Sequence, residues 1–165
     1  MNKEIVIVGM NHRTAPIEVR ESVAFESSYV LEALTRLRAY PSIQEGVILS
    51  TCNRVEVVAA AAHGGRASEE IKAFLAEQKA RKSRDSLDDH VYIYQGSEAV
   101  RHLFRVAASL DSMVVGEPQI LGQLKQYYNA AQKAGTVGTI LHRLRLNCSR
   151  AIRLGFFGLR DTRMA

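Results

Sequence analysis

The stretch GVILSTCNRVEVVAAAA, residues 46–62, decides the fold. Valine, isoleucine and alanine are abundant on both sides of a polar centre, Ser50-Thr51-Cys52-Asn53. Runs of β-branched and small apolar residues that flank a short polar segment are typical of paired strands. We therefore expect two strands, over 46–49 and 54–62, joined by a short turn that carries Cys52.

The residues around this hairpin continue the pattern of a small sheet. Before it we expect a buried strand over 4–10, a loop held extended by Pro16, and a helix capped by Ser27 or Ser28. The apolar face of that helix consists of Val30, Leu31, Leu34 and Leu37. After the hairpin we expect a helix over 68–80, a charged loop over 79–89 and a strand over 90–94. This order of elements is that of a ferredoxin-like βαββαβ sandwich, so the predicted fold class is α+β.

From Gly96 onward the hydrophobic spacing changes to that of helices. We expect one helix over 97–108, a second that starts at Pro118-Gln119, and a third, rich in arginine, from position 139. The apolar face of the third helix consists of Ile140, Leu144, Cys148 and Ile152. The sequence thus predicts a domain over 1–138 that ends in a helical subdomain, and over 139–165 the beginning of a long connecting helix.

The charge of the chain is concentrated in its last helix. Residues 1–138 hold 16 Lys+Arg and 16 Asp+Glu, so the net charge of +5 comes from residues 139–165. The arginines there are Arg143, Arg145, Arg150, Arg153, Arg160 and Arg163. Such a helix suits contacts with phosphates, and equally a solvated face that meets an acidic partner.

The composition excludes several classes of protein. With 165 residues, 47% apolar and 24% charged, the chain is neither low-complexity nor collagen-like. It shows no apolar run long enough for a membrane-spanning or signal segment, so we expect a cytoplasmic protein. Its two cysteines, Cys52 and Cys148, lie far apart and predict free thiols.

Cys52 is the first candidate for chemistry because a thiol in a turn at a strand end is exposed. Arg54 lies two positions away, and a nearby cation favours the reactive thiolate form of a cysteine. The alternative is a small core residue, which is the interpretation we favour for Cys148 on its apolar stripe.

Two histidines are candidates for proton transfer. His12 follows the first strand, and His102 lies on the helix after Gly96 beside apolar neighbours. Each also fits a hydrogen-bonded core histidine. Spacings that bind zinc are absent from the sequence, so we expect no metal site.

Residues 111–123 form a polar, glycine-punctuated segment that leads into a helix. Hydroxyl, carboxylate and amide groups there are of the kind that recognise an amino acid, although the segment also fits a helix-entry loop. The sequence contains neither GxGxxG nor GxxxxGK[ST] and so predicts no nucleotide-binding loop.

Three motifs together resemble the glutamyl-tRNA reductase family. They are GMNHRTAP (9–16) with Arg20-Glu21, STCNRVE (50–56), and LDS (110–112) with GEPQILGQLK (116–125). Their order and spacing match the family over most of the chain. The resemblance implies that the enzyme reduces glutamyl-tRNA to glutamate-1-semialdehyde, the first step of tetrapyrrole (porphyrin and haem) synthesis from glutamate. A cysteine thioester forms first, and NADPH then reduces it.

The resemblance also implies roles for individual residues. Cys52 is the expected nucleophile, and His102 looks like the family's activity-critical histidine. The expected substrate-binding residues are Thr51, Asn53, Arg54, Ser112, Glu117, Pro118, Gln119 and Gln123. Arg54 suits pairing with a carboxylate through its planar guanidinium.

Members of the family continue into NADPH-binding and dimerisation domains, so this chain resembles an excised catalytic domain over 1–138. We expect it to bind NADPH nowhere itself and to act at most as a glutamyl-tRNA esterase. The expected partners are glutamyl-tRNA, a second copy in the full-length homodimer, and glutamate-1-semialdehyde aminomutase; no membrane partner is expected.

Two alternatives without catalysis fit the same predicted fold. A ferredoxin-like RNA-binding module would stack bases on Tyr92 and Tyr94, which lie two positions apart on one strand face. An amino-acid-binding regulatory module would not need Cys52.

Overall fold

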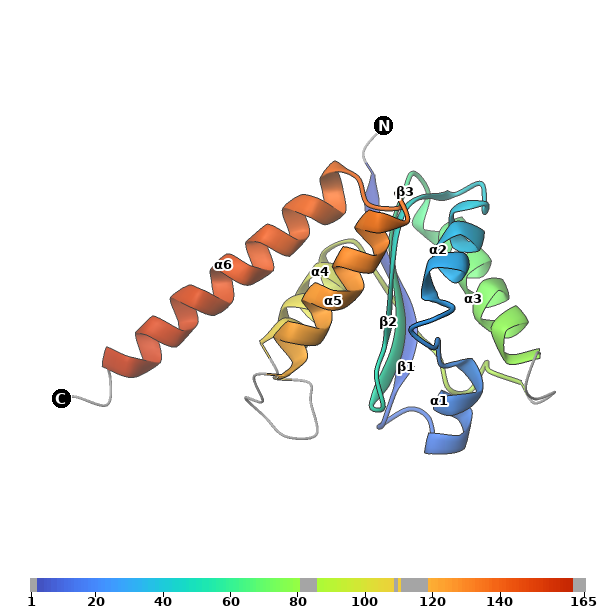
Figure 1. Cartoon of the computed structure of the whole chain (residues 1–165), viewed down its shortest axis with the longest axis horizontal. Coiled ribbons are helices and arrows are strands. Elements are labelled where there is room, and N and C mark those ends of the chain that lie inside the picture. The colour runs from blue at the N-terminus through green and yellow to red at the C-terminus, as the bar shows by residue number, and fades with distance from the viewer. Residues whose placement is uncertain (1–2, 81–85, 109, 111–118, 162–165) are drawn as a thin grey trace.

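The computed structural model describes residues 3–80, 86–108, 110 and 119–161. The described elements include both strands and helices up to Gln95 and are all helical from Gly96 onward (Figure 1). In chain order they are β1 (Glu4–Asn11), α1 (Ile17–Val23), α2 (Val30–Arg38), β2 (Ile43–Ser50), β3 (Arg54–Ala61), α3 (Gly64–Ala80), β4 (Tyr92–Gln95), α4 (Gly96–Ala107), α5 (Gln119–Lys133) and α6 (Thr139–Asp161).

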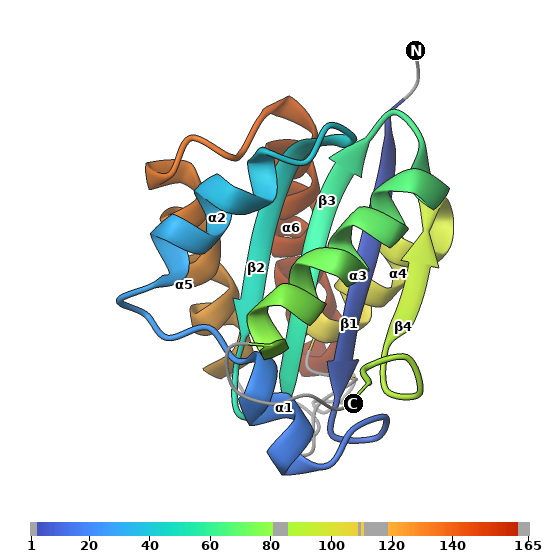
Figure 2. The ribbon, with the colours of Figure 1, turned by 90° about the vertical axis from the view of Figure 1, so that its right-hand side faces the viewer.

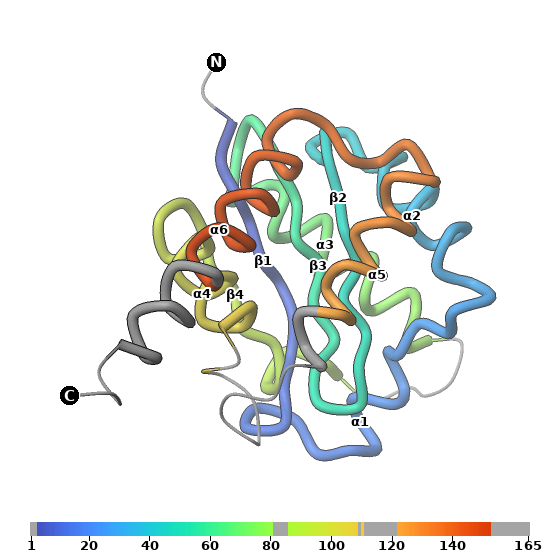
Figure 3. Tube along the Cα trace, turned by 60° about the vertical axis from the view of Figure 1, so that its left-hand side comes forward, coloured from blue at the N-terminus to red at the C-terminus, as the bar shows by residue number. Residues whose placement is uncertain are grey.

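The strands form one sheet with the order β2-β3-β1-β4, in which every neighbouring pair is antiparallel. This order confirms the predicted ferredoxin-like α+β sandwich. Figure 2 shows α1, α2 and α3 in front of one face of the sheet, and Figure 3 shows α4, α5 and α6 in front of the other. The sheet is therefore the middle layer of three.

Because helices cover both faces, the central strands are buried throughout. All eight residues of β3 are buried, and so are seven of the eight in β1. This explains why residues 55–61 form an almost continuous apolar run, in which Glu56 is the one exception. Among the described helices, none is both long and apolar enough to cross a membrane.

Three local predictions were wrong. The first helix, α1, was not expected; it starts directly after Pro16, whose fixed φ of −64° suits a helix entry. Helix α2 begins after Tyr29 without a side-chain cap, so neither Ser27 nor Ser28 caps it. Leu31, predicted on its apolar face, is 45% exposed, and Ala33 lies inward instead.

Helix α3 starts at Gly64, four residues before the predicted start at Ser68. The Ser68 hydroxyl donates to the carbonyl oxygen of Gly64 at 2.8 Å, a bond made inside a helix and not at its beginning. The other predicted helices and strands are confirmed, with ends that shift by a few residues.

The start of α6 is fixed to the edge strand β2 by a buried carboxylate. Glu45, 4% exposed, accepts hydrogen bonds from the backbone N–H groups of Ile140 (3.2 Å) and Leu141 (2.9 Å). Next to it, the N–H of Gly46 donates to the carbonyl oxygen of Thr136 at 2.8 Å, and the Thr136 hydroxyl donates to the carbonyl oxygen of Gly46 at 2.9 Å. A negative charge at a helix N-terminus is stabilising, so Glu45 determines where the connecting helix begins.

We expect Glu45→Gln to lower the free energy of unfolding by about 2 kcal/mol, because an amide cannot accept both N–H bonds of α6. Urea denaturation measures this. Glu69→Gln is the matched control, since the Glu69 side chain is 71% exposed. Equal stability of the two variants would contradict the anchoring role.

Candidate functional site

Cys52 lies on a tight turn between β2 and β3, as the sequence predicted. The N–H of Thr51 donates to the carbonyl oxygen of Arg54 at 2.8 Å, which closes the turn. The Thr51 hydroxyl oxygen then accepts from the N–H groups of Asn53 (3.3 Å) and Arg54 (3.2 Å). Thr51 thus holds the turn from inside, while Cys52 is exposed at its tip.

The second cysteine is chemically different. Cys148 is buried on α6, and burial raises the pKa of its thiol to about 11. It therefore stays protonated at neutral pH and packs as a core residue, as expected.

Two residues outside the hairpin, at the same end of the sheet, hold the cysteine turn. The N–H of His12 donates to the carbonyl oxygen of Asn53 at 2.9 Å. Arg20, on α1, donates its Nε–H to the carbonyl oxygen of Cys52 at 3.2 Å. The N–H of Cys52 itself has no acceptor within the described part of the chain.

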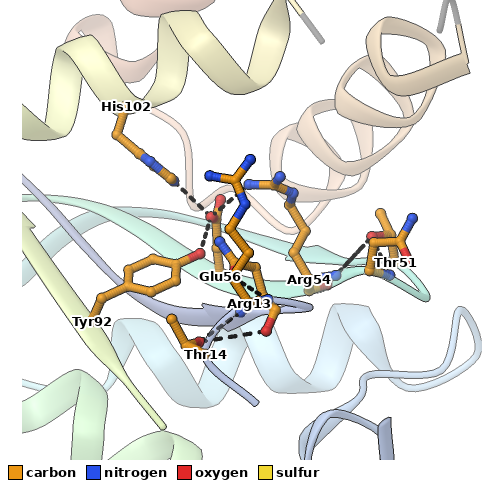
Figure 4. Close-up of polar contacts among 9 residues, drawn as sticks. Arg13, Thr14, Thr51, Arg54, Glu56, Tyr92 and His102 are labelled. Carbon is orange, nitrogen blue, oxygen red and sulfur yellow. Dashed lines mark hydrogen bonds and ion pairs between the residues drawn. The ribbon is translucent and has the colours of Figure 1, made fainter. Parts of the chain in front are cut away.

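A buried carboxylate, Glu56, organises the face of the sheet that lies under α4 (Figure 4). Its Oε1 lies 2.7 Å from Nε2 of His102 and 3.0 Å from Nη1 of Arg54, and it accepts from the Tyr92 hydroxyl. Glu56 is fully buried, Arg54 is 2% exposed and His102 is 8% exposed. Figure 4 also shows the Arg13 side chain directed to the same group.

This environment fixes the protonation of the cluster. Burial alone would raise the pKa of Glu56, but the hydrogen bond from His102, the charge of Arg54 and the bond from Tyr92 together lower it. Glu56 is therefore ionised at neutral pH and can only accept hydrogen bonds. Nε2 of His102 must carry a proton, which leaves Nδ1 as the ring nitrogen that can exchange one.

Gly9 makes room for this carboxylate. In the register of the sheet it lies between Glu56 on β3 and Tyr92 on β4. A side-chain carbon on Gly9 would lie 2.7 Å from Cγ of Glu56 and 2.5 Å from the carbonyl oxygen of Val55. The missing side chain lets Glu56 cross β1 to reach its partners.

The two tyrosines that an RNA-binding module would expose are covered by α4. The ring of His102 stacks on Tyr94 with centroids 4.6 Å apart and lies 5.5 Å from Tyr92. The sheet face is therefore not open to bases, which disfavours that alternative.

Only some of the predicted site residues lie together in the structure. Thr51, Cys52, Asn53 and Arg54 share the turn, whereas His102 is linked to it through Glu56 and Arg54, with no direct contact to Cys52 within the described residues. Gln123 is half-buried on α5. Ser112, Glu117, Pro118 and the side chain of Gln119 lie outside the described residues.

Tyr127 is a site residue that the sequence interpretation missed. Burial raises the pKa of its phenol, a hydrogen bond with the backbone of Ser50 lowers it, and the charge of Cys52 raises it again. The phenol thus stays protonated close to the cysteine turn. Glu56 and Arg20 were also missed as functional residues, although both lie inside quoted motifs; a lone charge within the apolar run was the one signal for Glu56.

NADPH, the cofactor that the resemblance implies, does not fit the described residues. Dinucleotide sites use a glycine-rich turn in a parallel βαβ unit. Here the turn after β1 has no glycine. Gly64 begins α3 and Gly96 begins α4, and both lie against the carboxylate of Glu4. That negative charge would repel a pyrophosphate. Over the described ranges, no three His, Cys, Asp or Glu side chains are grouped to hold a metal ion.

The fold and site define an α+β domain of ferredoxin-like topology with a cysteine turn beside a buried Arg–Glu–His cluster. Residues 8–155 match the family model "Glutamyl-tRNAGlu reductase, N-terminal domain". The chain therefore belongs to the glutamyl-tRNA reductase N-terminal domain family.

Individual relatives agree with this assignment. The chain is 46% identical over 145 residues to a glutamyl-tRNA reductase of Desulfatibacillum aliphaticivorans, covering 88% of this chain and 33% of that protein. It is 50% identical over 139 residues to one of Pelobacter propionicus, covering 84% and 32%. The solved glutamyl-tRNA reductase of Methanopyrus kandleri superposes with a TM-score of 0.69 at 34% identity, covering 98% and 35%. The chain thus spans about a third of these relatives.

We expect Gly9→Ala to destabilise the protein by about 2 kcal/mol, because the new methyl group meets both the Val55 backbone and Glu56. Thermal or urea unfolding measures the change. Gly65→Ala is the control, since nothing lies within 4 Å of its added carbon, and alanine favours the helix by about 0.5 kcal/mol or more. A Gly9→Ala protein as stable as the parent would disprove the close approach.

Proposed function

We propose that this chain carries out the acyl-transfer half of the glutamyl-tRNA reductase reaction. The Cys52 sulfur, as thiolate, attacks the carbonyl carbon of the glutamyl ester. A carbon–sulfur bond forms, the carbon–oxygen bond to the tRNA ribose breaks, and the released ribose oxygen takes up a proton. The observation that carries this proposal is the exposed thiol on a turn held by five hydrogen bonds, in a member of this family.

The backbone beside the sulfur supports this step. Attack on an ester places negative charge on the carbonyl oxygen, and a preorganised N–H donor stabilises that charge. The Cys52 N–H is adjacent to the sulfur and has no acceptor among the described residues. We assign it to the developing oxyanion, with the protonated phenol of Tyr127 nearby.

The Glu56 cluster supports proton transfer. Glu56 holds Nε2–H of His102, so that Nδ1 is the nitrogen available to accept or return a proton. Arg54 is buried against Glu56, and for it we propose this supporting role ahead of the predicted contact with the substrate carboxylate. Thr51 and Asn53 shape the turn, and the substrate roles of Ser112, Glu117, Pro118, Gln119 and Gln123 remain predictions.

We derive no reduction step for the described residues. In the absence of a reductant, water is the acceptor of the glutamyl group, so the predicted activity of this chain alone is that of an esterase.

The role in tetrapyrrole synthesis, the homodimer, the aminomutase partner and the cytoplasmic location remain proposals for the full-length enzyme. The arginines of α6 are proposed to contact tRNA phosphates, which makes binding sensitive to salt.

The second candidate is an amino-acid-binding module of the same architecture. The shielded Arg–Glu–His cluster fits either function, because a buried ion cluster also serves specificity of folding. Only the enzyme needs the Cys52 thiol.

We expect the chain, mixed with radiolabelled glutamyl-tRNA and quenched in acid, to retain label through a bond that hydroxylamine cleaves. Cys52→Ala should retain none, because the sulfur is lost, while Cys148→Ala should retain as much as the parent, because that thiol is buried. Label that persists in Cys52→Ala, or its absence in the folded parent with intact substrate, would refute the thioester and favour the binding module.

A further inference from the structure

We propose that Arg20 is a positioning residue for Cys52, acting from α1 on the backbone of the cysteine turn. The inference rests on the proposed acyl transfer, because it assigns the residue that aims the attacking sulfur. Arg20 accompanies the first of the three sequence motifs, GMNHRTAP (9–16), and the sequence alone assigned no function to its side chain.

Arg20 joins two loops that lie far apart in the chain. Its Nη1 donates to the carbonyl oxygen of Ala15 at 2.6 Å, and its Nε donates to the carbonyl oxygen of Cys52 at 3.2 Å. Ala15 is itself tied to the end of β1, since its N–H donates to the carbonyl oxygen of Asn11 at 3.0 Å. The guanidinium therefore connects the cysteine turn to the rigid end of a central strand.

The Cys52–Asn53 peptide is held at both of its polar atoms. Arg20 binds its carbonyl oxygen, and the Thr51 hydroxyl accepts from its N–H. A peptide plane fixed on both sides restricts rotation about the Cα–C bond of Cys52. The position of the Cys52 backbone, from which the side chain extends, is constrained in the same way.

The chemistry of Arg20 favours positioning over simple stabilisation. The side chain is 8% exposed, and within the described residues its partners are two neutral carbonyls and no carboxylate. Burying a charge without an opposite charge is costly, so such a group is a poor device for stability alone. Arginine reaches both oxygens through its planar fork, which the single ammonium of lysine cannot match.

The test is Arg20→Lys, with Arg101→Lys as control because the Arg101 side chain is 71% exposed on α4. Single-turnover formation of the hydroxylamine-sensitive adduct, at saturating glutamyl-tRNA, should fall by about tenfold to a hundredfold in Arg20→Lys. The affinity for glutamyl-tRNA and the rate of Cys52 alkylation by iodoacetamide should stay close to the parent values, because a small reagent needs only an accessible thiol. Arg101→Lys should match the parent throughout.

An unchanged single-turnover rate would overturn the proposal, and so would a parallel loss of acyl transfer and alkylation. Amide hydrogen exchange supplies a readout that needs no substrate: the N–H groups of Asn53 and Arg54 should exchange faster in Arg20→Lys. Unchanged exchange would overturn the positioning role, whether or not the parent chain forms a thioester. Failure of the parent chain to form a thioester would refute the proposed function instead.

Discussion

The ionised carboxylate of Glu56, buried in the middle of the sheet, is the interaction on which the site depends. A charge in such a place is tolerated only when it is neutralised and hydrogen-bonded. Three elements supply what it needs: Arg54 from the same strand, Tyr92 from the edge strand and His102 from α4. The requirement to satisfy one carboxylate therefore fixes where α4 and β4 lie and which nitrogen of His102 carries a proton.

The second support of the site comes from α1 and from the residue that follows β1. Arg54 lies two residues after Cys52 and is the first residue of β3, so the strand that carries Glu56 starts directly after the cysteine turn. Arg20 on α1 and His12 at the end of β1 hold the carbonyl groups of that turn. The thiol at its tip stays exposed while its backbone is bound from several directions, which is the arrangement a nucleophile requires.

Much of this architecture could be predicted from the sequence. The apolar runs around residues 50–53 predicted the hairpin and the exposed cysteine, and the helical spacing after Gly96 predicted the helical second part. The start of α2 could not be predicted, because Ser27 and Ser28 have the right chemistry but Tyr29 takes the position before the helix. The roles of Glu56, Gly9 and Arg20 depend on contacts between residues far apart in the chain, which no local pattern contains.

The most direct test of the central claim is the titration of the Glu56 carboxyl carbon by NMR, with Glu56→Gln to assign the signal. A carboxyl group whose pKa is lowered by folding stabilises the protein above its ordinary range and loses that contribution as the pH falls through the folded value. We predict that Glu56 titrates below 4.5, its ordinary value, and is ionised at neutral pH. A titration above that value would mean that the cost of burial outweighs the stabilisation of the carboxylate by His102, Arg54 and Tyr92, and would contradict the account.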